Sequence, residues 1–193
     1  PGDIKYKDIS GPDGVPDGKI DSHDRTIIGN PTPRYEFGLT LGLQWKGIDF
    51  SAFFQGVGKK DVYYSGAGAR ALCGNYTIYK YQFDYWTPEN PDAKFPRLLE
   101  DPNATNPNNM ISSFWVKSGA YCRLKNIVLG YTLPSSITKT AHISKLRVYA
   151  SAQNLFTIKD NFYEGFDPEN SVSSGASLYP LNKTFVFGLN VEF

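Results

Sequence analysis

Hydrophobic and polar residues alternate along five stretches of this chain. The clearest stretch carries Phe37, Leu39, Leu41, Leu43 and Trp45 at every second position, with polar residues or glycine between them. A period of two places successive side chains on opposite faces of a β-strand, so each stretch predicts a strand with one apolar face. The predicted strands cover residues 34–45, 48–55, 127–133, 146–153 and 183–193.

The connections between these strands alternate in length. Lys46-Gly47 is a tight turn that predicts a β-hairpin, and residues 134–144 form a moderate turn. Residues 56–112 and 159–182 are long loops. Outer-membrane barrels have short periplasmic turns and long extracellular loops, so this order predicts that the last strand runs down to the periplasm.

Strand length and aromatic placement separate a membrane barrel from a soluble sandwich. Alternating runs of about 9–11 residues suit tilted strands that cross the hydrocarbon layer. Aromatic residues near predicted strand ends are typical of the girdles at the two membrane interfaces: Tyr35, Trp45, Phe54, Phe114, Trp115, Tyr131 and Phe193. The expected fold class is all-β, an antiparallel transmembrane β-barrel segment with long extracellular loops. Five strands cannot close a barrel, so we expect a larger assembly.

Composition excludes several classes of protein. Of the 193 residues, 15% are aromatic. The formal net charge is +1, so the chain has no strong positive electrostatic field that would attract nucleic acid. The sequence contains no run of 18 apolar residues, so it predicts no transmembrane helix. The chain opens at Pro1 without a signal peptide, which suggests a mature fragment or a piece of a longer polypeptide. Cys73 and Cys122 lack metal-site spacing; they are either unrelated small residues or a disulfide pair.

Residues 1–33 are rich in Asp, Gly and Pro, and we expect an extracellular loop with a candidate calcium site, followed by the strands and loops of residues 34–193. Counted from Asp13, the loop places Asp17, Asp21 and Asp24 at positions 5, 9 and 12 of an EF-hand-like pattern. Gly18 would allow the sharp bend, and Lys19 would offer its backbone carbonyl.

Two departures weaken this calcium pattern. Val15 supplies no side-chain oxygen at the third position, and Asp24 replaces the longer bidentate glutamate at the twelfth. A second register begins at Asp8 with Ser10 and treats the proline-containing stretch as an insertion. The remaining alternative is a cluster of Asp and Gly turns that binds no metal.

A catalytic interpretation has little support. His23 and His142 are the two histidines, no nucleophile motif is present, and Asp167 and Glu169 are typical of a loop turn. We therefore expect no enzyme. Loop aromatics could stack on sugars, pack on a partner protein or pack on one another: Tyr63, Tyr64, Tyr76, Tyr79, Trp86 and Tyr163. Polar residues expected on the lumen face are Glu36, Gln44, Arg147, Gln153 and Asn190.

An ordered series of motifs runs almost from end to end of the chain. It comprises Gly2-Asp3-Ile4-Lys5-Tyr6-Lys7-Asp8, Asp17-Gly18-Lys19-Ile20-Asp21 with Asp24-Arg25, Ile28-Gly29-Asn30-Pro31-Thr32-Pro33, Phe53-Phe54-Gln55-Gly56, Tyr85-Trp86-Thr87-Pro88-Glu89-Asn90-Pro91, Arg123-Leu124-Lys125-Asn126-Ile127, Leu129-Gly130-Tyr131-Thr132-Leu133-Pro134, Leu146-Arg147-Val148-Tyr149, Asn154-Leu155-Phe156-Thr157 and the terminal Phe193. In these motifs the chain resembles the C-terminal part of the SusC/RagA family of TonB-linked outer-membrane transporters from Bacteroidetes.

The resemblance implies a barrel of about 22 strands in the cell outer membrane. It also implies a plug and a TonB-interacting segment upstream of this chain, and a SusD-like surface lipoprotein that acts as a lid. The implied cargo is an oligosaccharide (glycan) or a peptide, and Phe193 resembles a signal for barrel assembly. The alternative that the residues left open is a soluble, calcium-binding β-sandwich module that binds carbohydrate. A surface hydrolase is a third candidate without motif support.

Overall fold

A computed structural model describes residues 1–66, 68–72, 78–100, 107–162, 166–169 and 181–193. The chain divides into two compact units. The loop unit comprises Pro1–Thr32, Asp61–Ser118 and Asn161–Leu178, and the sheet unit comprises Pro33–Lys60, Gly119–Asp160 and Tyr179–Phe193. Both units are assembled from segments that are distant in sequence.

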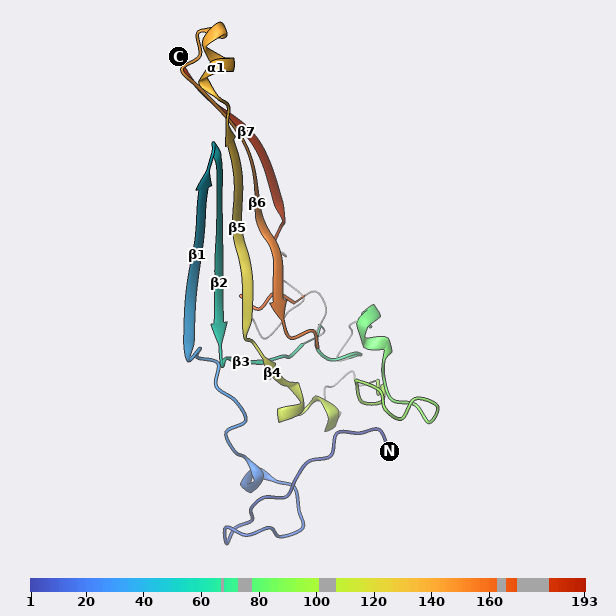
Figure 1. Ribbon diagram of the computed structural model, residues 1–193. Coiled ribbons are helices and arrows are strands. Elements are labelled where there is room, and N and C mark those ends of the chain that lie inside the picture. Colours follow the sequence, from blue (N-terminus) through green and yellow to red (C-terminus); the bar gives the residue numbers. More distant parts are fainter. Residues whose placement is uncertain (67, 73–77, 101–106, 163–165, 170–180) are drawn as a thin grey trace. The chain divides into compact units, whose positions relative to one another are not determined.

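The sheet unit is a five-stranded antiparallel meander (Figure 1). Its strands, in spatial and chain order, are β1 (Tyr35–Trp45), β2 (Ile48–Gly58), β5 (Tyr121–Thr132), β6 (Lys145–Lys159) and β7 (Thr184–Glu192). They contain 9 to 15 residues each. Each of the five predicted strands is therefore present. The structure makes β2, β5 and β6 longer than the alternating pattern, and β1 and β7 slightly shorter.

Short connections join two pairs of these strands. Lys46 and Gly47 both have positive φ angles, 45° and 86°, which is the conformation of a type I′ hairpin turn between β1 and β2. The turn between β5 and β6 contains the short helix α1 (Ser135–Thr138) and the 3-10 helix η5 (Lys139–Ala141). Among the described residues, no helix is both long enough and apolar enough to cross a membrane.

Strand register places the alternating residues of all five strands on two consistent faces. One row across the sheet pairs Leu43 with Phe50, Phe50 with Leu129, Leu129 with Ala150, and Ala150 with Phe187. These residues belong to an apolar face that is open to its surroundings; Leu43 is 63% exposed and Phe187 is 82% exposed. The predicted alternation is confirmed, and the sheet carries one uncovered apolar surface.

The opposite face carries the predicted polar residues. Arg147 of β6 reaches across β5 and donates two hydrogen bonds to Asp49 of β2, at 2.8 and 2.5 Å. Gly130 of β5 makes this crossing possible, because a Cβ atom there would overlap both charged groups. Tyr149 likewise lies over Gly188 of β7. Glycines on this face therefore give long polar side chains room to lie flat across neighbouring strands.

One irregularity interrupts the ladder. The register of β2 with β5 shifts between Phe53 and Phe54, and that of β5 with β6 shifts between Leu124 and Asn126. Against β2, Lys125 is the extra residue of a β-bulge, which lets polar Arg123 and Asn126 share a face although they are three positions apart. Against β6, Lys125 stands opposite two residues, Asn154 and Leu155. The prediction began this strand at Ile127 because the bulge breaks the period of two.

The loop unit has a small aromatic core of its own. Strands β3 (Asp61–Tyr63) and β4 (Val116–Ser118) pair, and Trp115 beside them is 2% exposed. Trp115 donates from its ring nitrogen to the carbonyl of Asn108 at 2.8 Å. Ala69 and Phe95 complete the core, and the 3-10 helices around it are η1 (Ser22–Asp24), η2 (Lys80–Phe83), η3 (Pro107–Asn109) and η4 (Ser113–Trp115). The long loop predicted over residues 56–112 thus contains regular structure.

Candidate functional site

The acidic loop at the start of the chain forms a capped turn. In η1, the Asp21 carboxylate accepts a hydrogen bond from the backbone N–H of His23, and the Asp24 carboxylate accepts one from the backbone N–H of Asp21, both at 2.8 Å. This reciprocal arrangement is a capping box, in which acidic side chains satisfy backbone donors that a helix start leaves without partners. The spacing of Asp21 and Asp24 therefore has a structural role in the turn.

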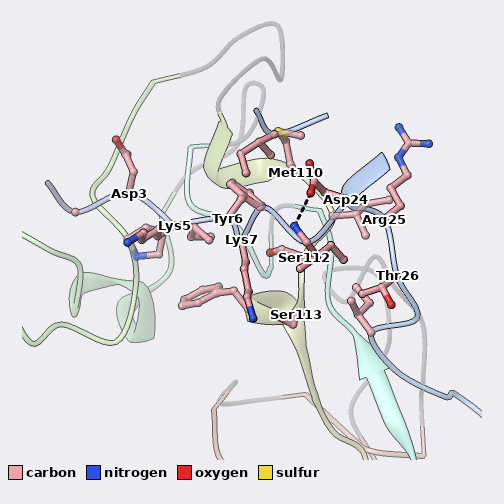
Figure 2. A pocket seen from close by; sticks show the side chains of 18 of the residues that line it. Asp3, Lys5, Tyr6, Lys7, Asp24, Arg25, Thr26, Met110, Ser112 and Ser113 are labelled. Atoms are coloured by element: carbon pink, nitrogen blue, oxygen red, sulfur yellow. Dashed lines mark hydrogen bonds between the residues drawn. The ribbon is translucent and has the colours of Figure 1, made fainter. Parts of the chain in front are cut away.

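Asp24 also ties the two ends of this loop together. Its Oδ1 atom accepts hydrogen bonds from the backbone N–H groups of Ile9, at 2.7 Å, and Ser10, at 3.2 Å. The dashed line in Figure 2 marks such a bond to the Asp24 carboxylate. Residues about fifteen positions apart in sequence are thereby brought to one carboxylate.

Asp8 makes the matching contact from the other side of the loop. Its Oδ2 atom accepts a hydrogen bond of 2.6 Å from the backbone N–H of Gly18, whose φ of +84° favours glycine. The Asp8 side chain also contributes, as the smallest of several causes, to the lowered pKa of Asp24, so the two carboxyl groups are neighbours in the loop.

The hydrogen bonds of the loop keep two of its acids charged. Backbone N–H donors, first that of Asp21 and then that of Ile9, hold the pKa of Asp24 below its usual range. The backbone N–H of His23 lowers the pKa of Asp21 in the same way, and the His23 ring adds to the effect. Both carboxylates are therefore negative at neutral pH, which favours a nearby cation.

One oxygen atom tests whether a cation fits. Asp8 Oδ1 is buried and, within the described part of the chain, has no hydrogen-bond partner. A buried acceptor without a partner is costly, and a hard cation would satisfy it. The described residues hold no ready cluster of three or more His, Cys, Asp or Glu side chains, so such a cation would also need backbone or hydroxyl oxygens. The residues fit calcium on those terms.

The structure distinguishes the two registers of the calcium pattern by their contacts. Asp8, Gly18 and Asp24 are joined by hydrogen bonds or direct approach, whereas Asp13 lies in a separate turn closed by the N–H of Gly14 and the carbonyl of Gly11. Asp17 bonds its own loop through the N–H of Lys19 at 2.9 Å. Asp8 and Asp24 therefore each bond a distant segment of the loop, Gly18 and Ile9–Ser10 respectively, as the register that begins at Asp8 would require.

A second cluster fastens the chain start to the loop unit. Arg97 donates to both carboxylate oxygens of Asp3, at 2.7 and 2.6 Å, and Asn108 donates to Asp3 at 2.8 Å. The Asn108 side chain in turn accepts the backbone N–H of Ile4 at 2.7 Å. The hydrogen bond from Arg97 is the main cause of the lowered pKa of Asp3. Sequence reasoning missed this cluster, because its members are about a hundred residues apart.

The acidic loop and the Asp3 cluster border one hollow of about 1430 Å³ in the loop unit. Figure 2 shows Lys5, Lys7 and Arg25 among the residues that line it, together with Tyr6, Met110, Ser112 and Ser113. The lining combines basic, hydroxyl and apolar side chains. Such a surface can accept hydrogen-bonding ligands of mixed polarity without a single dominant charge.

Comparison with known proteins identifies this arrangement. No family model matches the chain. TonB-dependent receptor P3 of Formosa agariphila is 33% identical over 210 residues, covering 100% of this chain and 19% of the receptor. TonB-dependent receptor SusC of Bacteroides thetaiotaomicron is 30% identical over 178 residues, covering 91% of this chain and 17% of SusC. The RagAB peptide importer in its open-open state superposes with a TM-score of 0.68 at 28% identity, covering 94% of this chain and 20% of that one.

The chain belongs to the SusC/RagA family of TonB-dependent receptors. This SusC/RagA chain spans about a fifth of the length of the relatives it matches. Family members are outer-membrane proteins, and the relatives are receptors and importers rather than enzymes. The expected localisation and the expected antiparallel β fold class are therefore confirmed, and the relatives agree with the expectation of no enzyme.

The sandwich alternative fails for this SusC/RagA chain. A sandwich buries the apolar face of one sheet against a second sheet. Here Leu39, Leu43 and Leu189 on the apolar face are 52%, 63% and 68% exposed, and the matching structures belong to importers. The apolar face suits a lipid environment instead.

The remaining predicted site residues of this SusC/RagA chain pack within the loop unit. Tyr63 and Tyr64 border the core around Trp115, and Tyr79 stacks on Tyr81 with ring centroids 5.8 Å apart. Trp86 covers the backbone of Gly2. These contacts agree with the alternative in which the loop aromatics pack on one another. Tyr76, Tyr163 and Cys73 lie outside the described residues, and Cys122 is a half-buried free thiol.

The candidate carboxylate pair forms a local turn. The Asp167 side chain accepts a hydrogen bond of 2.9 Å from the backbone N–H of Glu169. Such a bond two residues along the chain is typical of an Asx turn. This agrees with the interpretation of Asp167, Pro168 and Glu169 as a loop turn, and with the non-enzymatic character of the family.

Proposed function

We propose that this chain works as part of an outer-membrane TonB-dependent importer that takes up glycans or peptides. The observation that carries the proposal is the two-faced sheet of the sheet unit. Its apolar face suits lipid, and its polar face, with the Asp49–Arg147 pair, suits a hydrated interior. Kinship with SusC and with the RagAB peptide importer supports the same function.

The partners of the importer are part of this proposal. A SusD-like surface lipoprotein would cover the extracellular side, where the loop unit would lie. TonB would supply energy through a segment outside this chain. The mixed lining of the large hollow, with Lys5, Lys7 and Arg25, supports contact with a polar ligand or partner. One structural neighbour, RagAB, is a peptide importer, and we propose either a peptide or an oligosaccharide as cargo.

The proposal is tested on the intact receptor that contains this chain. We expect the receptor in the outer-membrane fraction, with migration on a denaturing gel that changes on boiling. Deleting the receptor gene should abolish growth on one glycan or peptide source. Reintroducing the gene should restore this growth only in cells whose TonB-dependent energy coupling works. A buffer-soluble receptor whose migration ignores boiling would contradict the proposal.

We also propose that the acidic loop binds Ca²⁺. Asp8 and Asp24 would supply carboxylate oxygens, with the hydroxyl of Ser10 and the carbonyl of Lys19 as further ligands, while Asp17 and Asp21, the other carboxylates of the sequence pattern, bond backbone N–H groups of their own turns. The buried Asp8 Oδ1 atom and its approach to Asp24 support this ligand set. Bound calcium would neutralise these charges and hold the loop closed. Asp13 belongs to the other register.

Calcium binding has a direct test in the intact receptor. Terbium luminescence and isothermal titration should show one site, and chelation should lower the thermal stability of the loop unit. We expect the Asp8→Asn and Asp24→Asn variants to lose affinity by at least about tenfold, since each removes a charged ligand. Asp13→Asn is the matched control and should bind normally. Equal loss in Asp13→Asn would overturn the register, and no binding to the unaltered receptor would overturn the site.

A further inference from the structure

The apolar face of the sheet unit contains a groove across β5, β6 and β7. Its volume is about 620 Å³, within the range of about 300–1,000 Å³ that small-molecule sites occupy. The groove exists because Ala150, a small residue, stands between two large ones in the same row of the sheet, Leu129 on one side and Phe187 on the other. Val148 and Tyr131 extend its walls along the strands.

The floor of the groove is closed from the other face of the sheet. The backbone of Gly130 and Gly188 forms part of the floor. On the opposite face, Arg147 lies over Gly130 and Tyr149 lies over Gly188. The groove is therefore open on the apolar face of the sheet and closed on the polar face. A ligand has to enter it from the apolar side.

One end of the groove meets the β1–β2 turn, where cationic and aromatic groups gather. Tyr131 lies against Gly47, with its ring 3.4 Å from the position of a Cβ atom. Ile48, which lines the groove, pairs with Trp45, and the Lys46 ammonium lies 4.9 Å from the centre of the Trp45 ring. Trp, Tyr and Lys are the residues that anchor proteins at a membrane interface. A chain-like ligand in the groove would thus place an anionic head beside Lys46.

We propose that this groove holds one acyl chain of a phospholipid of the periplasmic leaflet, with the lipid phosphate beside Lys46. The apolar walls match a hydrocarbon chain, the closed floor admits a ligand from the membrane alone, and the positive charge stands at the interfacial end. The leaflet follows from the strand orientation in the proposed function. Retention of the lipid depends on the groove itself and not on any transported substrate.

The test uses the intact receptor in detergent and native mass spectrometry, with phosphatidylglycerol and phosphatidylethanolamine as probes. We expect one phospholipid to remain bound to the unaltered receptor. Ala150→Leu fills the groove and should reduce the lipid-bound fraction about tenfold. Ala150→Val, a smaller filling, should give an intermediate loss. Leu39→Phe adds bulk to the same apolar face outside the groove and should retain the lipid.

The charge is tested separately. Lys46→Gln should weaken the binding of both phospholipids, whereas binding of diacylglycerol, which has no phosphate, should be unchanged. Equal lipid retention in Ala150→Leu and Leu39→Phe would overturn the proposal, as would a receptor that retains no phospholipid. A mass twice that of one receptor, without bound lipid, would show that a second receptor copy covers the apolar face. That result would also overturn the proposal. Heat-modifiable migration identifies variants that fold, and none of these outcomes depends on uptake.

Discussion

Asp3 shows how one carboxylate can organise a long loop. It receives donors from Arg97 and Asn108, and Asn108 also accepts the N–H of Ile4, so the start of the chain is fastened to two distant segments. The side chains of Asp3 and Arg97 are 33% and 41% exposed. Solvent therefore screens the ion pair, and its contribution to stability is small.

This cluster predicts a local pH dependence. Arg97 lowers the pKa of Asp3 below its ordinary value of 3.8, so the contact stabilises the folded state above about pH 4 and is lost as the pH falls through the folded-state pKa. We expect Arg97→Gln to speed amide exchange over residues 2–6 up to about fivefold at neutral pH. Hydrogen exchange with mass detection measures this. Lys5→Gln is the control, and equal acceleration in both variants would show that the ion pair is not the cause.

Between strands, close approach decides which positions tolerate a side chain. Gly56 of β2 is buried, and a Cβ atom there would overlap the carbonyl oxygen of Tyr121 in β5 and the ring of Phe37 in β1. Gly42 of β1 is exposed, and a Cβ atom there would have nothing within 4 Å. Glycine thus has a packing role at position 56 that it lacks at position 42.

These two glycines predict opposite results for the same substitution. Gly56→Ala should destabilise the sheet by about 1–3 kcal/mol, because a backbone carbonyl cannot move aside as a flexible side chain can. Gly42→Ala should stay within about 0.5 kcal/mol of the unaltered receptor. The temperature at which the folded gel band disappears reports the difference. If the folded band of Gly42→Ala disappears at the same low temperature as that of Gly56→Ala, the loss of stability comes from replacing any strand glycine and not from the close approach at Gly56.

Considered as a whole, the sheet unit ends in two open edges. β1 and β7 each pair with one neighbour among the described strands. An exposed strand edge beside an open apolar face promotes aggregation, so neighbouring strands of a larger barrel should cover both edges. Residues 1–193 expressed alone should therefore form aggregates or need detergent to stay dispersed. Size-exclusion chromatography tests this, and a folded monomer in buffer would contradict the expectation that neighbouring strands have to cover the edges.

Strand prediction succeeded where neighbours in sequence determine the outcome. The period of two between Tyr35 and Trp45 is a local property, and Lys46-Gly47 encodes its own turn. The bulge at Lys125 was missed because its extra residue is recognised only against the partner strands. The core around Trp115 was missed for a related reason, since its members come from loops without a period.

The sequence by itself determined the class of this protein: strands with one apolar face, long loops, and motifs that resemble the SusC/RagA family. The tertiary structure decided which groups meet. It bonded Asp8 to Gly18 and Asp24 to Ile9 and Ser10, joined Asp3 to Arg97, and set Ala150 between Leu129 and Phe187. The physical reason is that side-chain periodicity is a property of the local backbone, whereas a hydrogen bond or a groove depends on distances between segments that only the folded chain brings together.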